Sequence, residues 1–315
     1  MISVIIPNWN GAAHLPECLA ALHAQTDRDF EVLVVDNNST DESLRLLAAR
    51  HSAVRVIALQ HNAGFTGACN AGLAAAFGSL LVLLNNDTAA APDWLAEVRA
   101  AFARNPNAGS VASRMLLYDK RDTLHTAGDL FGSDGMPANR GVWQRDTGQY
   151  SEGEVFSACG GSAAYRRSML EETGLLDERF FFSCEDVDLG WRAQLRDWRC
   201  VYAPRAIVYH KLASTGGGPT ASYYDGRNSI HVLVKDLPGI VWRRHWRSIL
   251  RRQLQLAVQA LRSWRGAAAR ARLRGQLAGI AAVPAMLAAR RRVQAARLIS
   301  DARVLALLSS APQDA

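Results

Sequence analysis

Short apolar runs alternate with helical patterns throughout the first hundred residues, and this alternation limits the fold more than any other feature of the chain. The β-branched runs have the length of strands, and the segments between them repeat apolar residues at helical spacing. Strands are predicted at residues 3–6, 32–35, 54–59 and 80–84, and helices at 15–22, 44–49 and 68–77. The last of these strands is apolar at every position, as expected where helices cover both faces. The pattern predicts an α/β fold with a doubly wound, mostly parallel sheet flanked by helices.

The rest of the chain divides into an insertion, further core elements and a tail. Residues 116–155 are polar and poorly periodic, and we interpret them as an insertion that carries substrate contacts. After the insertion we expect a glycine-rich strand at 157–165, a helix at 185–196, two short strands ending at Tyr202 and His210, and closure of the globular unit near Leu237. Ser39 and Glu42 have the spacing of a capping box, which predicts a helix start just after residues 36–38.

The tail carries the positive charge of the chain. Residues 240–315 contain fifteen arginines against Asp301 and Asp314, a net charge of +13, so the overall charge of +7 leaves −6 for residues 1–239. From Trp242 to Leu261, apolar residues recur at helical spacing with arginines between them, which predicts a basic amphipathic helix. The sequence thus predicts a globular unit at 1–237 and a basic helical region at 238–315.

Two structures are compatible with this basic region. Tryptophan together with arginine favours a helix lying on an anionic membrane surface, and the apolar stretch at 277–289, interrupted by Pro284, is too short to span a bilayer. The alternative is a helical subdomain packed on the globular unit. Nucleic acid is disfavoured as a partner because no nucleic-acid-binding motif accompanies the charge.

Cysteine usage and the N-terminal sequence bear on the compartment. The five cysteines are scattered and never spaced as Cys-x-x-Cys, so neither a disulfide framework nor a zinc cluster is predicted. Met1 is followed at once by a strand pattern, without the basic and apolar regions of a signal peptide. We therefore expect a cytoplasmic protein, peripheral on the inner face of the cell membrane.

Polar residues follow three of the predicted strands at the point where each strand ends. They are Pro7-Asn8-Trp9-Asn10, Asp36-Asn37-Asn38 and Asn85-Asn86-Asp87. Ligands of open parallel sheets bind outside the carboxyl ends of the strands, so one crevice can collect all three segments. Asp36 suits the hydroxyl groups or base edge of a nucleoside. Asp87 suits a hard cation that bridges to phosphates, because Mg²⁺ takes one or two carboxylates plus substrate oxygens.

Three further segments are candidates for the site. Asn62–Gly72 places small residues where a loop enters a helix, which suits close approach to an anion, but it lacks the Gly-x-Gly-x-x-Gly and Gly-Lys-Ser/Thr patterns of dinucleotide and P-loop sites. The acidic run 185–188 begins a helix, whose dipole is expected to keep a base ionised. His210 ends a strand and precedes a glycine-containing loop at 214–219, a candidate cover for bound substrate.

Taken in order, five of these motifs closely resemble those of family 2 glycosyltransferases. They are Ser3–Gly11, Val34–Asp41, Asn62–Gly72, Leu83–Thr88 and Glu185–Leu189, and the resemblance spans residues 1 to about 237. It is closest to the bacterial branch that contains rhamnosyltransferases and galactofuranosyltransferases. This implies a glycosyltransferase A fold, a nucleotide-diphosphate sugar donor and inversion at the anomeric carbon.

The resemblance also implies roles for individual residues. Donor contacts are implied for Pro7, Trp9, Asn10, Asp36, Asn38, Asn62, Gly67, Asn70 and Asn86, and acceptor-side contacts for Gly160, Gly161, Glu185, Trp191 and Arg227. Asp186 matches the catalytic base. Asp87 matches the last residue of the Asp-x-Asp motif that holds Mg²⁺ or Mn²⁺, and His210 matches a histidine that completes the metal site. Two positions depart from the pattern: Asn85 stands where many relatives have the first aspartate, and Cys69 where asparagine is frequent.

The implied reaction is a single displacement in which Asp186 takes the proton of an acceptor hydroxyl as its oxygen attacks the anomeric carbon. We expect L-rhamnose from deoxythymidine diphosphate rhamnose as the transferred sugar, and a glycan or lipid-linked glycan of the cell envelope as the acceptor. A nucleotidyltransferase that makes nucleotide sugars is disfavoured because residues 8–11 contain no basic residue. A non-catalytic, membrane-bound glycan-binding relative is disfavoured because Asp87, Asp186 and His210 are all present.

Overall fold

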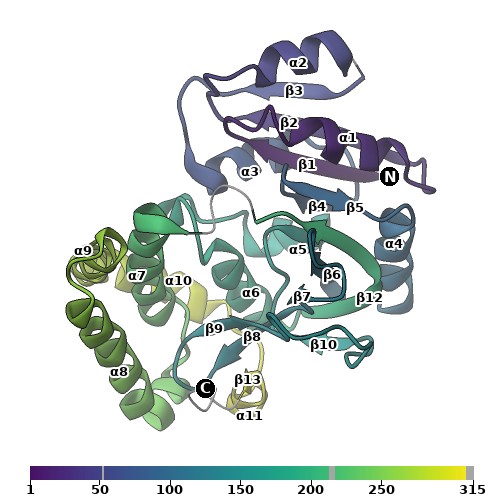
Figure 1. Cartoon of the computed structure of the whole chain (residues 1–315). Coiled ribbons are helices and arrows are strands. Elements are labelled where there is room, and N and C mark those ends of the chain that lie inside the picture. Colours follow the sequence, from purple (N-terminus) through teal and green to yellow (C-terminus); the bar gives the residue numbers. More distant parts are fainter. Residues whose placement is uncertain (52, 213–216, 310–315) are drawn as a thin grey trace.

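The computed structural model describes residues 1–51, 53–212 and 217–309. Within these residues, ten strands form a central sheet with the order β10-β12-β6-β11-β4-β1-β2-β3, while β5 pairs with β12 and β7 with β6 (Figure 1). The strands are β1 (Ile2–Asn8), β2 (Phe30–Asp36), β3 (Arg55–Ala58), β4 (Leu80–Leu84), β5 (Thr88–Ala90), β6 (Ala108–Leu117), β7 (Leu124–Thr126), β10 (Gly153–Val155), β11 (Ser162–Arg166) and β12 (Arg199–His210). Strands β3, β2, β1 and β4 are mutually parallel, and β11 runs antiparallel to β4 and β6.

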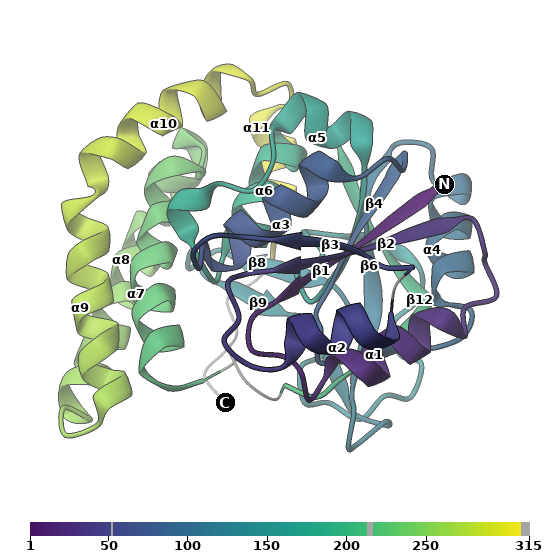
Figure 2. The same cartoon turned by 90° about the horizontal axis from the view of Figure 1, so that it is seen from above.

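Helices cover both faces of this sheet, as the apolar strand β4 predicts. They are α1 (Leu15–His23), α2 (Ser43–Arg50), α3 (Gly64–Ala75), α4 (Trp94–Arg104), α5 (Arg167–Thr173) and α6 (Glu185–Leu195). The apolar side chains of α1 and α4 pack with one face of the sheet and those of α3, α5 and α6 with the other (Figure 2). The predicted strand–helix order of residues 1–84 is confirmed. The carboxyl ends of β1, β2 and β4 consequently lie side by side.

Three local predictions were wrong. Ser39 does not cap α2, because its hydroxyl accepts hydrogen bonds from the side chain of Asn8 and the backbone N–H of Asn10. The helix begins four residues later, at Ser43, whose backbone N–H donates to Asp41. The glycine-rich segment 157–161 precedes β11 instead of forming part of it. The two strands expected to end at Tyr202 and His210 are one strand, β12, with an irregularity between Ala203 and Ile207 that interrupts the apolar alternation.

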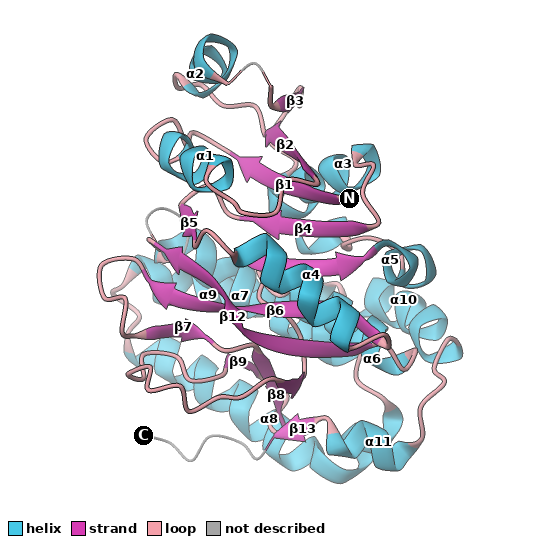
Figure 3. Ribbon diagram, turned by 90° about the vertical axis from the view of Figure 1, so that its right-hand side faces the viewer, coloured by secondary structure: helices cyan, strands magenta, loops and turns pink. Residues whose placement is uncertain are grey.

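The insertion contains more regular structure than its sequence pattern predicts. Besides β7 and β10, it contributes β8 (Asp129–Gly132) and β9 (Pro137–Asn139). These two strands join β13 (Leu308–Ser309) in a separate three-stranded sheet (Figure 3). Strands of two to four residues are too short to produce a recognisable alternation, which is why the segment reads as irregular.

Four long helices form a layer beside the sheet. They are α7 (Gly218–Lys235), α8 (Gly239–Arg262), α9 (Ala267–Ala281) and α10 (Val283–Ala295), followed by the short α11 (Asp301–Ala306). The predicted amphipathic helix at 242–261 is confirmed as α8, and Pro284 lies in the first turn of α10. These helices pack on the globular unit through a third apolar cluster that includes Trp191, Val232 and Ile249. None of the described helices is long and apolar enough to cross a membrane.

Candidate active site

The three polar strand ends converge, as predicted from a parallel sheet. Asn8 and Asp36 are opposite each other in the β1–β2 register, and Asn8 Nδ2 donates to Asp36 Oδ1 at 3.0 Å. Asn86 Nδ2, beyond the end of β4, donates to Asn8 Oδ1 at 2.8 Å. The second oxygen of Asp36 accepts from Ser39 N at 3.0 Å. These hydrogen bonds hold the floor of the crevice in one arrangement.

The loop after β1 lies beside these strand ends. Asn10 has a left-handed backbone (φ 52°), as does Asn38 (φ 62°), a conformation that asparagine tolerates better than most residues. Asn10 Oδ1 accepts from Thr40 N at 2.8 Å, which ties the two loops together. Trp9 is 53% exposed beside them, so its ring is available to a ligand, whereas Pro7 lies within β1.

The expected donor loop is held by its own side chains. Asn62 Oδ1 accepts from Asn37 Nδ2 and from Gly64 N. Gly67 is buried in the first turns of α3. Asn70 donates to Leu176 O at 2.8 Å and accepts from Leu176 N at 3.1 Å. The side chain of Asn70 therefore fixes the segment before α6 to α3.

Asp87 and His210 meet because β5 pairs with the end of β12. His210 is opposite Thr88 in that pairing, and its Nε2 lies 3.1 Å from Asp87 Oδ1, with both side chains buried. Asn85 Nδ2 lies 3.5 Å from the same ring nitrogen. Neighbouring ligands of an octahedral ion at about 2.1 Å are about 3 Å apart, so the oxygen–nitrogen separation fits a shared divalent ion.

His125, on β7, extends this cluster and was missed by the sequence reasoning. Its Nδ1 lies 3.2 Å from Nδ1 of His210, and its Nε2 lies 3.4 Å from the side-chain nitrogen of Asn139. Burial, reinforced by the charge of His210, lowers the pKa of His125 to about 4. A lone histidine in a segment interpreted as a polar insertion gives no sequence signal of this contact. Among the described residues, no three His, Cys, Asp or Glu side chains form a metal-binding group.

Asp186 and Glu185 begin α6, opposite a pair of glycines. Asp186 Oδ2 accepts from Gly160 N at 2.8 Å. A Cβ placed on Gly160 would lie 3.3 Å from Glu185 Oε1 and 3.5 Å from Asp186 Oδ2. A Cβ on Gly161 would lie 3.4 Å from His210 Cε1, and Gly161 O accepts from Asn85 N at 3.0 Å. Side chains at either glycine would thus crowd the space between Asp186 and His210.

The electrostatics of the acidic pair differ from the sequence expectation. Burial raises the pKa of Asp186, and the backbone hydrogen bonds from Gly160 and Val187 offset only part of that effect. Burial together with the charge of Asp186 raises the pKa of Glu185 well above its usual range. The helix N-terminus was expected to help keep a base ionised, but desolvation acts in the opposite direction and raises the pKa of both groups. Glu185 Oε2 is buried and has no hydrogen-bond partner among the described residues.

Two of the residues expected on the acceptor side, Trp191 and Arg227, make contacts within the protein. Trp191 is 0% exposed, and its ring packs against Phe131 and Phe156 at 5.0 Å between centroids. The residue lies in α6, five positions beyond Asp186, on the side that faces the third apolar cluster. An acceptor at the surface of the crevice cannot reach it.

Arg227 and its neighbour Asn228 support the backbone that leads to Asp186. Arg227 donates to the carbonyl oxygens of Arg179 and Phe180, and Asn228 donates to those of Phe180, Phe182 and Ser183. Ser183 and Cys184 have left-handed backbones (φ 70° and 64°) immediately before α6. Such conformations persist where surrounding contacts impose them, and these donors supply such contacts. Residues 214–216 of the expected covering loop lie outside the described residues.

Comparison with known proteins gives a family match and several relatives. Residues 3–174 match the family model described as Glycosyl transferase family 2. N-acetylglucosaminyl-diphospho-decaprenol L-rhamnosyltransferase of Mycobacterium tuberculosis is 29% identical over 282 residues, which cover 81% of this chain and 91% of that protein. The O-antigen biosynthesis protein RfbC of Myxococcus xanthus is 31% identical over 241 residues, 71% of this chain but 18% of that protein.

Solved structures share the fold at low sequence identity. TarS 1-349 of S. aureus in complex with UDP has a TM-score of 0.59 at 19% identity, covering 93% of this chain and 90% of that chain. The mannosyltransferase PcManGT of Pyrobaculum calidifontis, in complex with GDP-Man and Mn²⁺, has a TM-score of 0.56 at 18% identity, covering 97% and 85%. These likenesses confirm the predicted mostly parallel, helix-flanked fold of the glycosyltransferase A type.

Proposed function

Because the chain belongs to glycosyl transferase family 2 and is therefore a glycosyltransferase, we propose that it moves a sugar from a nucleotide-diphosphate donor to a lipid-linked or polymeric glycan with inversion. The observation that carries the proposal is the Gly160–Gly161 backbone, which has Asp186 on one side and His210 on the other. Because glycines have no side chains, they leave room for a reacting sugar between the base, Asp186, and the pair of Asp87 and His210 on the side of the diphosphate.

The donor would bind along the convergent strand ends. The Asn8–Asp36–Asn86 network and the loop at Asn10 and Asn38 would orient the nucleoside, and the exposed ring of Trp9 offers a stacking surface. Asn62, Gly67 and Asn70 support this wall through the contacts of α3. In this arrangement the donor diphosphate points toward Asp87.

Asp87, His210 and Asn85 would hold the divalent ion, Mg²⁺ or Mn²⁺. Their donor set of one carboxylate oxygen, one imidazole nitrogen and one amide group matches such an ion, and PcManGT, which shares the fold, was solved with Mn²⁺. An ion held by these residues would supply positive charge that stabilises the departing diphosphate. Since the protein offers few charged ligands, binding is expected to be tighter with the nucleotide diphosphate present than without it.

Asp186 acts as the base in the proposed displacement. Its carboxylate accepts the proton of the acceptor hydroxyl while that oxygen forms a bond to the anomeric carbon and the bond from that carbon to the diphosphate oxygen breaks. Attack from the side opposite the leaving group inverts the centre. The raised pKa of Asp186 makes its ionised form a stronger base than an exposed aspartate. Glu185 Oε2, unpartnered at the same place, is available to an acceptor hydroxyl.

L-rhamnose from deoxythymidine diphosphate rhamnose is the proposed sugar, and a lipid-linked glycan of the cell envelope is the proposed acceptor. The names of the relatives support both: one is a rhamnosyltransferase named for a diphospho-decaprenol acceptor, and another is named for O-antigen biosynthesis. Exposed apolar side chains on α8 and α9, interspersed with arginines, support a peripheral position on an anionic membrane surface, where such an acceptor resides.

Replacement of Asp186 by asparagine tests the function. We expect turnover of sugar to fall by about 10² to 10⁴-fold, the usual contribution of a general base, while the donor still binds. Product analysis with a panel of nucleotide sugars and glycosyl-diphospholipid acceptors measures this directly. A glycosylated acceptor with release of nucleoside diphosphate supports transfer, whereas release of pyrophosphate would identify a nucleotidyltransferase. Wild-type turnover by the variant would remove Asp186 as the base.

Stability measurements show whether a loss of turnover results from unfolding of the variant. An acid whose pKa is higher in the folded than in the unfolded state binds its proton more tightly when folded, so its contribution to stability falls as pH rises through that window. Asp186→Asn removes this cost, so its melting temperature at neutral pH should equal or exceed that of the wild type. Asp197→Asn, an exposed aspartate just beyond α6, is the matched control and should keep wild-type turnover.

A further inference from the structure

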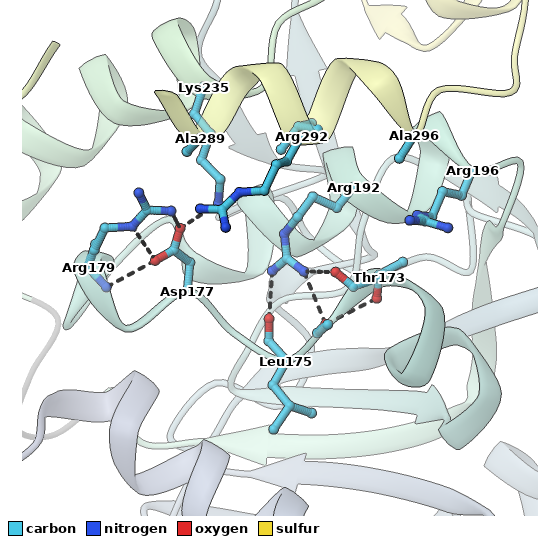
Figure 4. Close-up of a pocket in the computed structure, with 12 residues that line it drawn as sticks. Thr173, Leu175, Asp177, Arg179, Arg192, Arg196, Lys235, Ala289, Arg292 and Ala296 are labelled. Atoms are coloured by element: carbon cyan, nitrogen blue, oxygen red, sulfur yellow. Dashed lines mark hydrogen bonds and ion pairs between the residues drawn. The ribbon is translucent and has the colours of Figure 1, made fainter. Parts of the chain in front are cut away.

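A cavity of about 330 Å³ lies away from the catalytic crevice, between the globular unit and α10. Its walls come from the turn after α5, the second half of α6, the end of α7 and one side of α10 (Figure 4). The lining residues include Arg192 and Arg196, which are six and ten positions beyond Asp186 and hence about 9 and 15 Å further along the helix direction. The cavity is therefore a separate site from the one assigned to the sugar donor.

The lining of this cavity is strongly basic. Five cationic side chains face it, and Asp177 is the one carboxylate among the lining residues. The cations are Arg179, Arg192, Arg196, Lys235 and Arg292. Apolar lining is limited to small or branched side chains such as Leu175 and Val293, so the cavity does not suit a large apolar ligand. Its volume is at the lower end of the range of small-molecule sites.

Three of the cations are fixed by Asp177 and Asp188, of which Asp188 is fully buried. Lys235 contacts both Asp177, at 2.6 Å, and Asp188. Arg192 donates to Asp188 at 2.9 Å and to three carbonyl oxygens of the turn after α5. Arg179 pairs with Asp177. Burial alone would raise the pKa of Asp177, but Arg179 and Lys235 outweigh it and hold that pKa below its usual range.

The other two cations have no ion-pair partner. Within the described part of the chain, the side chains of Arg196, which is partly buried, and Arg292, which is exposed, make no hydrogen bond or ion pair. In Figure 4, Arg292 extends from α10 into the cavity and Arg196 lies at the end opposite Arg179. The five cations face two carboxylates, Asp177 and the fully buried Asp188, so the net charge of the group is +3. Asp236, also buried beside this network, has its pKa raised by burial, which opposes its ionisation.

We propose that this cavity is a binding site for a phosphate or diphosphate group, held by its cationic side chains, of which Arg196 and Arg292 have no ion-pair partner. Arginine matches phosphate oxygens with paired N–H donors, and a concave basic wall strengthens that attraction. A bound phosphate would join the end of α6 to α10, across the seam between the globular unit and the C-terminal helices. The phosphate group comes from either a soluble anion or the headgroup of an anionic lipid.

The site is tested with inorganic diphosphate as the probe, in EDTA so that no divalent ion recruits the probe to Asp87. Isothermal titration and melting temperature are measured for the wild type and for Arg196→Gln/Arg292→Gln, at an ionic strength matched with sodium chloride. We expect the wild type to bind and to gain at least about 2 °C in melting temperature at saturation, and the double variant to bind at least about tenfold more weakly. Arg50→Gln/Arg291→Gln, which removes the same charge from exposed positions outside the cavity, should bind as the wild type does.

Vesicles distinguish the two sources of the phosphate. Sedimentation with phosphatidic acid vesicles, compared with phosphatidylcholine vesicles, should be reduced in the cavity double variant if a lipid headgroup enters the site. Unchanged sedimentation together with lost diphosphate binding would identify a soluble anion as the ligand. The double variant without anion should melt no lower than the wild type, because like charges have been removed from one cavity. If the wild type and the double variant are indistinguishable with both diphosphate and vesicles, the proposal is wrong. Neither readout depends on glycosyl transfer, so failure here leaves the proposed function unaffected.

Discussion

At the scale of single residues, the proton positions on His210 decide whether its Nε2 can bind a metal. A lone pair on Nε2 requires the proton on Nδ1, which must then be donated to an acceptor. His125 Nδ1, at 3.2 Å, is that acceptor, and Asn139, whose side-chain nitrogen lies 3.4 Å from His125 Nε2, accepts from that ring nitrogen when its amide is turned to present the oxygen. A chain of two hydrogen bonds thus selects the tautomer of His210.

Replacing His125 by phenylalanine should therefore weaken metal binding. Phenylalanine has a ring of similar size, but it cannot accept the hydrogen bond from His210. Removal of groups that support a metal ligand in this way lowers metal affinity by about 10 to 100-fold. Mn²⁺ titration in the presence of deoxythymidine diphosphate, followed by electron paramagnetic resonance, measures the effect. His125→Gln, which keeps an acceptor, should recover part of the affinity. Equal affinity in the phenylalanine variant and the wild type would show that His125 does not orient His210.

Residue roles were predictable from sequence to different degrees. The convergence of Asn8, Asp36 and Asn86 follows from parallel strands, because their ends share one edge of the sheet. The contact between Asp87 and His210 depends on the antiparallel pairing of a three-residue strand, which no local pattern specifies. The burial of Trp191 and the backbone contacts of Arg227 could not be predicted, because a motif identifies a position in the chain, not the direction in which its side chain points.

At the scale of elements, the crossing of α7 and α9 depends on backbone contact. A Cβ at Gly275 would lie 2.0 Å from the carbonyl oxygen of Tyr223 on α7, and 3.1 Å from Arg227 N. Backbone atoms cannot move aside as the end of a flexible side chain can. The two helices can therefore approach this closely because position 275 has no side chain.

Gly275→Ala should destabilise the protein although alanine is the better helix former. Helix propensity favours alanine by about 1 kcal/mol, whereas overpacking of a tight contact costs typically about 1–3 kcal/mol, and here the obstacle is backbone. Urea denaturation should give a lower midpoint. Gly153→Ala, where a Cβ has no neighbour within 4 Å, is the control and should leave the midpoint unchanged. A higher midpoint for Gly275→Ala would contradict the close crossing.

Elements with a strong period were predicted well and those that depend on distant partners were not. The α8 helix was found because one of its faces is apolar, and β4 because every residue is apolar. The sheet of β8, β9 and β13 was missed because its strands are short and one of them comes from the C-terminal region. The insertion and the tail, expected as separate regions, are joined by this pairing.

At the scale of the whole molecule, α8 has two sides with different surroundings. Val241 and Ile249 are buried against the globular unit, while Trp246, Leu250 and Leu254, one turn apart, are 48%, 53% and 65% exposed. Exposed apolar side chains on α9, such as Leu277 and Ile280, add to this surface. Packing on the globular unit and contact with a membrane are therefore compatible, because they use different sides of the helices.

Leu250→Glu/Leu254→Glu should abolish most of the binding to anionic vesicles. Each leucine that leaves the membrane forfeits about 1.5–3 kcal/mol, and every 1.4 kcal/mol is a factor of ten in affinity, so we expect a loss of at least about tenfold. Co-sedimentation with phosphatidylglycerol and phosphatidylcholine vesicles measures it. Leu44→Glu, on α2 at the other end of the molecule, is the control (Figure 1). Equal recovery of the wild type on both kinds of vesicle would exclude an electrostatic membrane contact.

The pairing of β13 with β8 also affects how the protein is made. Ser309 Oγ donates to Phe131 O across 178 positions of sequence. At about 5–20 residues per second, a ribosome needs on the order of 10–40 s to produce the second partner after the first. During that interval one edge of β8 has unpaired backbone groups, which can associate with strands of other nascent chains. Translation that stops before residue 308 would make this exposed edge permanent.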